Sequence, residues 1–361
     1  MKVLQVINSL NTGGAEKLLL ETIPLYNKKG IEVDLLLLNG KKTPFLETLK
    51  TVNCCKIYAI GTSAYNPFHI FRLVPFLRKY DIAHVHLFPS QYWIVLAKML
   101  SFSKIKIVVT EHSTTNPRIA NYLLSIIDRF IYKFYDKIIC ITIDVYQIKV
   151  KHLKEQKSKC IVIQNGVELQ NIYDAQPYTK RMISGLFTEQ DILLLHIATF
   201  NKHKNQKTAI KALKELPENV KLIFVGDGPL KADCENFAKE LNLVNRVIFL
   251  GNRTDVPRLL KTIDISILST NGEGFSLVAI ESMAAGIPFI GSDVPGMINV
   301  KDAGILFEKG NADELAFYIR KLIDENDFYE SIVKSGKKRA EQFDIEFMVD
   351  KHILLYQTIL E

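Results

Sequence analysis

Short apolar runs alternate with longer amphipathic stretches along most of the chain, and this alternation constrains the fold more than any other feature. The runs are predominantly apolar, which is typical of parallel strands buried on both faces of a sheet. Strand–helix alternation of this kind predicts doubly wound parallel α/β lobes. In the first half, the predicted strands are 2–7, 32–38, 56–60, 82–86, 106–110, 137–142 and 160–164, and a clear predicted helix is 15–29.

The alternation is interrupted once and then begins again. Residues 168–188 contain Pro177, Gly185 and mixed polar side chains, which is a composition typical of a linker. Beyond them the predicted strands are 192–199, 220–225, 247–250, 265–268 and 288–291, with helices that include 206–216, 230–241 and 277–285. Because 361 residues exceed one typical domain, we predict an N-terminal lobe over 1–167, a linker over 168–188, a C-terminal lobe over 189–343 and a final amphipathic helix over 344–361.

The positive charge is concentrated in the first half of the chain. Residues 1–180 hold 24 Lys and Arg against 13 Asp and Glu, whereas the remainder holds 22 against 26. A basic half favours an anionic partner, either nucleic acid or an anionic membrane, although a merely soluble lysine-rich surface gives the same count. No nucleic-acid-reading motif is present, so we expect no nucleic-acid partner. The basic residues between 72 and 106 alternate with Phe71, Phe76, Tyr80, Trp93 and Phe102, which favours a peripheral membrane contact.

The N-terminus and the cysteines favour a cytoplasmic location. Residues 1–7 have the pattern of a strand and not of a signal peptide, and no apolar run approaches the roughly 20 residues of a spanning helix. The five cysteines are odd in number and irregularly spaced, unlike a disulfide framework or a zinc site. We therefore expect a cytoplasmic protein that at most contacts the inner face of the cell membrane.

Glycine-rich loops follow several predicted strands, where ligands bind in parallel α/β sheets. Gly13 and Gly14 precede the helix 15–29, and Gly226 and Gly228 follow the strand 220–225. Such loops let a phosphate approach the backbone at a helix N-terminus. A tight strand–helix turn explains the same glycines, so both interpretations stay open. Two lobes facing each other would hold a ligand in the cleft between them.

The loop after the strand 265–268 combines more candidate binding groups than the other loops. It runs from Asn271 through Glu273 into the helix that carries Glu281. Its backbone N–H groups form an anion site, and the two carboxylates can accept hydrogen bonds from sugar or ribose hydroxyls. Lys204 follows the strand 192–199 and could neutralise a leaving diphosphate. A solvated lysine and a surface glutamate are the structural alternatives.

Three histidines lie at the ends of two consecutive predicted strands. His84 and His86 share one face of a strand end, and His112 follows the next strand. No nearby carboxylate completes a metal site and no Asp-x-Asp pair is present, so we expect no metal and no cofactor. The open alternatives are hydrogen bonding to a polar substrate and burial as satisfied core histidines.

Together these motifs resemble glycosyltransferase family 4, the retaining enzymes of the GT-B fold, over nearly the whole chain. The most specific motif is E-x7-E, from Glu273 to Glu281. The other motifs in family order are Gly13-Gly14-Ala15-Glu16, Asn165-Gly166-Val167, Lys204-Asn205 and Gly226-Asp227-Gly228-Pro229. The resemblance implies transfer of a hexose or N-acetylhexosamine from a nucleotide sugar, with UDP favoured, to a glycan or lipid-linked oligosaccharide. It also implies that the C-terminal helix crosses back to the first lobe.

The resemblance implies roles for individual residues. The residues implied to be catalytic are Glu273, Lys204 and His112. The residues implied to bind the donor are Gly14, Thr199, Arg253, Gly274, Phe275, Ser276, Leu277 and Glu281. The acceptor-side candidates are His84, His86 and Glu16. Thr199 departs from the family, which commonly has an arginine there, so half of the usual cationic clamp is missing.

Two further functions remain open on the same fold. A nucleotide-sugar epimerase would interconvert sugars without an acceptor. A non-catalytic relative would bind a sugar nucleotide or a partner enzyme, and the Thr199 departure is the feature that favours it.

Overall fold

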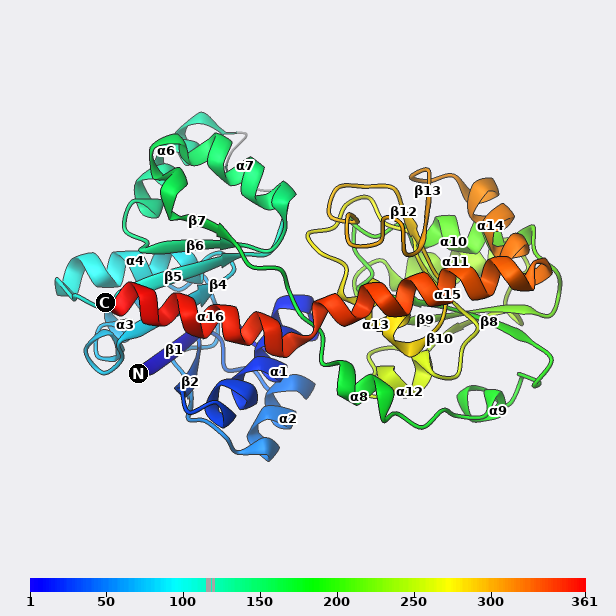
Figure 1. Ribbon diagram of the computed structural model, residues 1–361, viewed down its shortest axis with the longest axis horizontal. Coiled ribbons are helices and arrows are strands. Elements are labelled where there is room, and N and C mark those ends of the chain that lie inside the picture. The colour runs from blue at the N-terminus through cyan, green and yellow to red at the C-terminus, as the bar shows by residue number, and fades with distance from the viewer. Residues whose placement is uncertain (115–117, 119–120) are drawn as a thin grey trace. The chain divides into compact units, whose positions relative to one another are not determined.

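The computed structural model describes residues 1–114, 118 and 121–361, which divide into two compact units. The first unit consists of Met1–Gly166 together with Ile345–Glu361, and the second consists of Val167–Asp344. Each unit has one parallel sheet with helices on both sides of it (Figure 1). The doubly wound α/β architecture predicted from the sequence is confirmed.

The first unit is built on a seven-stranded sheet in the order β3-β2-β1-β4-β5-β6-β7. Its strands are β1 Lys2–Ile7, β2 Glu32–Leu37, β3 Ile57–Ala59, β4 Ile82–His86, β5 Lys106–Glu111, β6 Lys137–Cys140 and β7 Cys160–Val162. Its helices are α1 Gly14–Lys28, α2 Pro44–Val52, α3 His69–Leu73, α4 Ser90–Ser101, α6 Tyr122–Tyr132, α7 Ile143–Leu153 and α16 Ile345–Leu360, with 3-10 turns η1 Phe76–Arg78 and η2 Lys154–Lys159. All strand pairs are parallel.

The second unit is built on a six-stranded sheet in the order β10-β9-β8-β11-β12-β13. Its strands are β8 Ile192–Ile197, β9 Val220–Val225, β10 Val247–Phe249, β11 Ile265–Leu268, β12 Phe289–Ser292 and β13 Ile305–Phe307. Its helices are α8 Leu169–Tyr173, α9 Lys180–Ile183, α10 Gln206–Lys214, α11 Lys231–Glu240, α12 Val256–Leu260, α13 Leu277–Ala285, α14 Ala312–Asp324 and α15 Asn326–Ala340, followed by η3 Glu341–Phe343.

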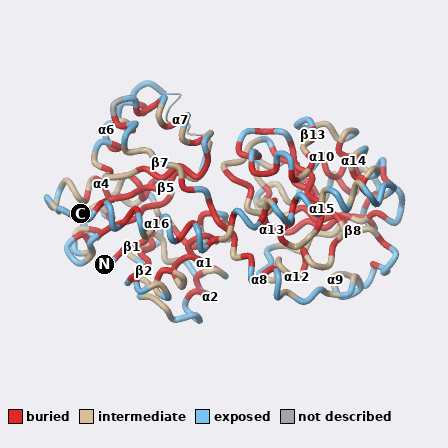
Figure 2. Tube along the Cα trace, viewed as in Figure 1, coloured by how far each residue is buried: buried red, intermediate tan, exposed pale blue. Residues whose placement is uncertain are grey.

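Buried residues follow the strands of both sheets, as the red segments in Figure 2 show. On β8, Leu194 packs in the apolar layer of α10 and α14, whereas Leu193 and Leu195 pack in the layer of α12 on the other face. Both faces are therefore covered, which is why the strands are predominantly apolar. Neighbouring residues of a strand face opposite layers, as strand geometry requires.

Two segments have more structure than the sequence predicts. Residues 168–188, predicted to be a linker, contain the short helices α8 and α9 within the second unit. The three-residue strand β13 completes the second sheet and was not predicted. Among the helices of the described residues, none has both the length and the apolar character needed to cross a bilayer.

Candidate functional site

Each sheet has one point at which the strand order reverses, and parallel α/β sheets bind their ligands beside such a point. In the second unit it lies between β8 and β11. The loops that leave these two strands are bonded together, because Lys204 and Thr270 form an antiparallel bridge and the Asn205 N–H donates to the Ser269 carbonyl at 3.1 Å. The predicted lysine and the E-x7-E loop are thereby fixed side by side.

Lys204 and Glu273 form an ion pair at this point. The Lys204 ammonium donates to Oε1 of Glu273, and the two side chains are 17% and 11% exposed. Two opposite charges held with this little water interact more strongly than a surface pair. The structure thus brings together two of the three residues predicted to be catalytic.

The loop that follows Glu273 ends at the N-terminus of α13. Ser276 is the N-cap residue, and its Oγ accepts a hydrogen bond from the Ala279 N–H at 3.3 Å. The first N–H groups of a helix have no partner inside the helix and are suited to an anion. Gly274 lies half-buried within the loop, and Leu277 is the first residue of α13. This geometry is compatible with the predicted anion-binding loop, and anion binding itself stays a prediction.

Two predicted donor residues near this loop are buried. The Phe275 ring is 8% exposed and packs edge-on against Phe343, with 5.5 Å between the ring centroids. Glu281 lies on α13 and is 3% exposed. Its predicted contact with ribose hydroxyls stays a prediction.

The turn 294–300 packs against the loop that follows Glu273, and this contact was not predicted from the sequence. The Glu273 N–H donates to the Pro295 carbonyl at 3.3 Å. Gly296 has φ +87°, and a Cβ at that position would lie 2.2 Å from the Glu273 carbonyl oxygen. Asn299 is 2% exposed and donates through Nδ2 to the Ser276 carbonyl at 3.1 Å, whereas its Oδ1 has no hydrogen-bond partner. The Pro295-Gly296 dipeptide was the available signal for a turn.

The loop after β8 carries Thr199 on the same side of the sheet. Its Oγ1 accepts from Asn201 at 2.8 Å and its carbonyl accepts from Gln206 at 3.1 Å, so the threonine serves the loop's own conformation. Gly226 and Gly228 pack directly against this loop, since a Cβ on Gly226 would lie 2.1 Å from the Ala198 oxygen. These two glycines therefore have a structural reason that needs no ligand.

Arg253 and His196 have different surroundings in the second unit. Arg253 is exposed and binds the Asp255 carboxylate through Nε at 2.8 Å, which lowers the pKa of Asp255 to about 2. The charge of this arginine, which was predicted to bind the donor, is thus partly neutralised by its own loop. His196 on β8 is fully buried, and burial lowers its pKa to about 4.

In the first unit the strand order reverses between β1 and β4, and α1 begins beyond β1. Gly14 is its first residue and is exposed, and Gly13 is the N-cap. The Glu16 carboxylate folds back over Gly13, because a Cβ there would lie 2.3 Å from Oε2 of Glu16. Burial raises the pKa of Glu16 to about 7, although a hydrogen bond from its own backbone N–H opposes this.

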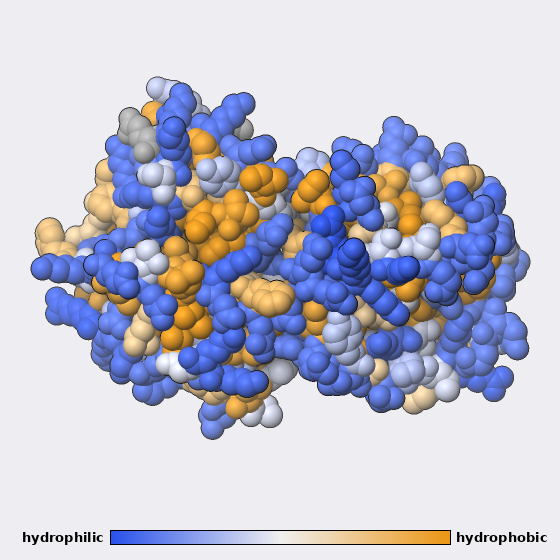
Figure 3. All heavy atoms as spheres, viewed as in Figure 1, coloured by the Kyte–Doolittle hydropathy of each residue, from blue (hydrophilic) through white to orange (hydrophobic). Residues whose placement is uncertain are grey.

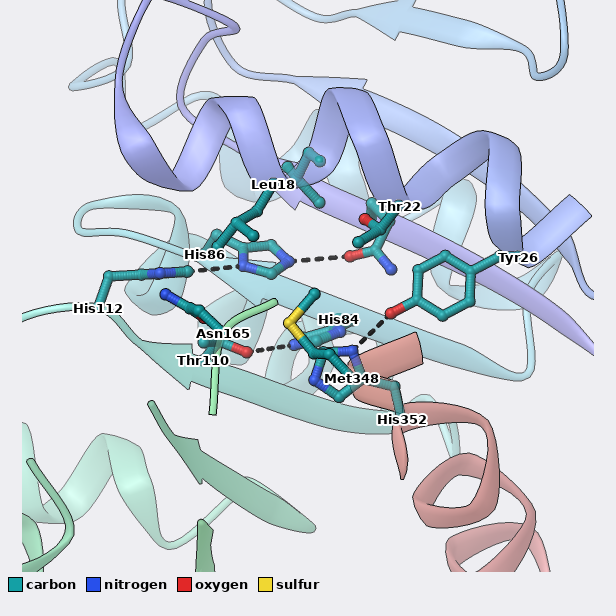
Figure 4. Close-up of a pocket in the computed structure, with 12 residues that line it drawn as sticks. Leu18, Thr22, Tyr26, His84, His86, Thr110, His112, Asn165, Met348 and His352 are labelled. Carbon is teal, nitrogen blue, oxygen red and sulfur yellow. Dashed lines mark hydrogen bonds between the residues drawn. The ribbon is translucent and has the colours of Figure 1, made fainter. Parts of the chain in front are cut away.

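Beside the same reversal point, the three predicted histidines join a buried hydrogen-bond network (Figure 4). His84 bonds through Nδ1 to the Tyr356 hydroxyl at 2.5 Å and through Nε2 to the Thr110 hydroxyl at 2.6 Å. His86 bonds through Nδ1 to His112 at 3.0 Å and through Nε2 to Oε1 of Gln5 at 2.9 Å. His84 or His86 could contact a substrate only if one of these hydrogen bonds were broken and replaced by a bond to the substrate.

Burial keeps this network neutral. It lowers the pKa of His112 to about 4 and that of His352 to about 3, and it lowers the pKa values of His84 and His86 well below the ordinary range. A neutral His86 that donates from Nε2 to Gln5 must accept at Nδ1, so His112 donates from Nε2. The nitrogen left to His112 for another partner is then Nδ1, as an acceptor. The cavity that these rings line has a volume of about 20 Å³, which is room for one water molecule.

A buried ion pair anchors the segment that presents His112. Lys149 Nζ lies 3.0 Å from Oε2 of Glu111, and the side chains are 2% and 9% exposed. The Tyr132 hydroxyl donates to the same carboxylate. Because Glu111 directly precedes His112 at the end of β5, this pair fixes where the histidine leaves the sheet. Among the described residues, no three His, Cys, Asp or Glu side chains are grouped as metal ligands.

Curated relatives of this chain include proteins named as glycosyltransferases and one named as a synthase. N-acetyl-alpha-D-glucosaminyl L-malate synthase of Bacillus anthracis is 29% identical over 301 residues, which are 78% of this chain and 75% of that protein. A 4-alpha-N-acetylgalactosaminyltransferase of Campylobacter jejuni, whose name describes a diphospho-undecaprenol-linked saccharide, is 25% identical over 359 residues, 94% of each chain. An alpha-1,3-galactosyltransferase of Escherichia coli, named for UDP-Gal and GlcNAc-diphosphoundecaprenol, is 27% identical over 294 residues, 77% of this chain and 75% of that one.

Solved structures share the fold. Anabaena HepE in complex with UDP-glucose has a TM-score of 0.86 at 19% identity, with 99% of this chain and 100% of that chain covered. WaaG, a glycosyltransferase involved in lipopolysaccharide biosynthesis, has a TM-score of 0.74 at 16% identity, with 97% and 98% covered. At these identities the likeness shows the GT-B fold alone.

Two family models match consecutive parts of the chain. The model described as Glycosyltransferase Family 4 matches residues 12–171, and the model described as Glycosyl transferases group 1 matches residues 179–339. The two matches lie on the first and the second sheet respectively, in the order in which the chain builds them. With its two Rossmann-like sheets and its E-x7-E loop beside Lys204, the chain belongs to glycosyltransferase family 4.

Proposed function

We propose that this protein is a retaining glycosyltransferase that moves a hexose or N-acetylhexosamine from a nucleotide sugar, with UDP as the carrier, to a glycan or lipid-linked oligosaccharide in cell-surface polysaccharide biosynthesis. The observation that carries the proposal is the Lys204–Glu273 pair beside the N-terminus of α13. The names of the Campylobacter jejuni and Escherichia coli relatives support a lipid-linked acceptor, and the UDP-glucose complex of Anabaena HepE supports UDP.

In this proposal the ion pair is exchanged when the donor binds. The Lys204 ammonium transfers from Glu273 to the donor diphosphate, and the N–H groups at the start of α13 bind the same diphosphate. Glu273 is thereby released to accept hydrogen bonds from the hydroxyls of the transferred sugar. A buried cation aimed at a leaving group is worth about 2–4 kcal/mol of transition-state stabilisation.

The bond changes follow the retaining outcome. The acceptor hydroxyl forms its bond to the anomeric carbon on the face from which the diphosphate leaves, the bond between that carbon and the phosphate oxygen breaks, and the departing phosphate takes the hydroxyl proton. The protein positions the reactants and stabilises charge. The proposal needs no metal. Trapping a glycosyl-enzyme adduct would replace it with a double displacement.

The decisive test is donor binding by calorimetry. UDP, GDP, ADP and their common hexoses are titrated into the wild type and Glu281→Ala, with and without magnesium. We expect one nucleotide to bind without magnesium and to lose at least tenfold in affinity in the variant, as expected for the loss of a charged hydrogen bond. Glu240→Ala, on the exposed end of α11, is the matched control and should bind like the wild type. An absolute requirement for magnesium would contradict the metal-independent mechanism.

The Thr199 departure gives weight to one competing function. A threonine carries no charge, so the second cation of the usual clamp is absent at that position, and its hydroxyl is engaged within its own loop. If a donor binds but no product forms with any acceptor, the protein is a non-catalytic relative that senses or carries a sugar nucleotide. Conversion of the sugar without any acceptor would instead identify an epimerase.

A further inference from the structure

Helix α6 has its apolar side outward. Six of its eleven residues are large hydrophobic side chains that are at least 44% exposed: Tyr122, Leu123, Leu124, Ile126, Ile127 and Phe130. Tyr122 and Leu123 are 75% and 70% exposed. An ordinary surface helix turns such a stripe toward the core. An exposed stripe of this kind marks an interaction surface.

Polar contacts hold α6 on the unit in this orientation. Asp128 is fully buried and accepts hydrogen bonds from the Tyr92 hydroxyl at 2.6 Å and from Nε of Arg118 at 3.0 Å, and His152 Nε2 lies 3.1 Å from its other oxygen. Burial by itself would raise the pKa of Asp128, but these contacts outweigh it and lower the pKa to about 2. The helix is therefore anchored by a charge at its centre, and its outward apolar face is a fixed feature of the fold.

The neighbourhood of this face is basic. Residues 98–159 hold twelve Lys and Arg against five Asp and Glu. Lys133 directly follows α6, and its carbonyl accepts a hydrogen bond from Lys159 at 2.7 Å, which joins η2 to the end of α6. Lys133, Lys154 and Lys157 are exposed, as is Lys151 at the end of α7. In this segment, none of the acidic side chains whose burial is described is exposed.

We propose that α6 and the exposed lysines of η2 and α7 dock this unit on a bilayer that contains anionic lipid. The apolar face of α6 would lie among the acyl chains, and the lysines would contact the phosphate groups. A second copy of the chain fits less well, because it would bring two basic surfaces together. Hydrophobic patches over this unit are visible on the face shown in Figure 3.

This surface differs from the one predicted in the sequence. Tyr80 donates to Asp34 and the Trp93 indole donates to the Ala64 carbonyl, so both aromatic rings are partly buried. Lys98 and Lys106 both pair with Asp136. Phe71 and Phe102 are 61% and 92% exposed, so part of the predicted surface is open to solvent as well. The continuous apolar face lies on α6, next to the exposed lysines of α7 and η2.

The test is flotation with vesicles of phosphatidylcholine alone and of phosphatidylcholine with phosphatidylglycerol. We expect the full chain to float with the anionic vesicles only, and to be released by salt. The double variant Leu123→Ser/Ile127→Ser should lose at least tenfold in bound fraction. Leu354→Ser, whose side chain is 64% exposed on α16 of the same unit, is the matched control and should still float.

The charge contribution is tested separately. Lys151→Ser/Lys154→Ser should weaken binding to anionic vesicles severalfold, whereas Lys41→Ser/Lys42→Ser, which removes two exposed lysines elsewhere in the unit, should not. Equal loss in both double variants would leave only a general effect of net charge and would overturn the assignment to α7 and η2.

Two outcomes would overturn the proposal as a whole. One is flotation that is absent from the wild type, or unchanged in Leu123→Ser/Ile127→Ser. The other is a dimer in light scattering that this variant converts to a monomer, which would make a second copy the occupant. The inference rests on the membrane-linked acceptor proposed above, but calorimetric donor binding in the same variants separates the two, since a normal donor affinity without flotation would leave the transferase proposal intact.

Discussion

At the scale of single residues, the chemistry depends on pairs that are distant in sequence. Lys204 and Glu273 are 69 residues apart, and His84 and Tyr356 are 272 apart. Lysine and glutamate are common on protein surfaces, so neither residue type alone indicates a site. The sequence can indicate such a residue only through its position after a strand. The sequence predicted Lys204 and Glu273 in this way, but it could not predict that they bind each other.

Replacing Lys204 tests that pair. Lys204→Met should lower kcat/KM by about 10²- to 10³-fold, because the leaving diphosphate loses its cation and Glu273 is left buried without one of its partners. Steady-state kinetics with the identified donor is the measurement. Lys211→Met removes an exposed lysine from α10 and should leave kcat/KM unchanged. A loss confined to KM would show that the lysine binds substrate and transition state equally.

Glu16 and the histidines should make the first unit respond to pH in opposite directions. Burial raises the pKa of Glu16 from 4.5 to about 7, so the carboxyl stabilises the folded state below pH 4.5 and loses this contribution as the pH rises to 7. Urea unfolding from pH 4.5 to 8 should show this slope in the wild type relative to Glu16→Gln. Identical pH profiles for the two proteins would show that Glu16 is solvated and not buried.

The lowered pKa of His112 has the reverse effect. Its pKa falls from 6.5 to about 4, so the unfolded chain binds the proton first and stability is lost as the pH falls between these values. His112→Asn should lose less stability than the wild type between pH 6.5 and 4, as measured by urea unfolding at each pH. His203→Asn, which replaces an exposed histidine, is the control and should follow the wild type.

At the scale of elements, the loop of the E-x7-E motif depends on the turn beneath it. Gly296→Ala places a methyl group 2.2 Å from the Glu273 carbonyl oxygen at φ +87°, so the loop must shift. We expect donor affinity to fall at least tenfold in calorimetry while the circular dichroism spectrum is unchanged. Gly30→Ala has φ +80° but nothing within 4 Å of the new methyl group, so it reports backbone strain alone and should bind donor normally.

The elements were predictable where the chain is buried on both faces. The ranges of β1, β4, β9 and β11 follow from short, predominantly apolar runs and agree with the prediction at both ends. β13 was not predicted, whereas β3, β7 and β10, which are also three residues long, lie within predicted strands. The outward face of α6 could not be predicted either, because an apolar stripe in a sequence normally indicates a core-facing side. In the structure, the buried Ser125, Asp128 and Tyr132 show which side faces the protein.

At the scale of the whole molecule, the first unit is discontinuous in sequence. Ile345–Glu361 belong to it although 178 residues of the second unit come before them. In α16, His352 lies 2.6 Å from the Tyr26 hydroxyl and Tyr356 contacts His84. The histidine network is therefore complete only when the two ends of the sequence have met.

Replacing Tyr356 tests this closure. Tyr356→Phe removes one hydroxyl that His84 bonds and leaves a buried ring nitrogen unsatisfied, which should destabilise the first unit by about 1–3 kcal/mol. Hydrogen exchange followed by mass spectrometry should show faster exchange in β1, β4 and β5 but not in β8 or β11. A uniform change in both sheets would mean that the two units unfold as one.

The return of the chain to the first unit also determines when this unit can complete its folding during synthesis on the ribosome. A contiguous domain can fold as soon as its last residue has emerged, but here the residues after Gly166 occupy the ribosome for roughly 10 to 40 seconds before Ile345–Glu361 arrive, at about 5–20 residues per second. Throughout that interval α16 is not yet present to contact α1 and the histidines of β4. The nascent first unit is thus accessible to chaperones for longer than the second unit. A chain that terminates before Ile345 contains a complete second unit and an incomplete first unit.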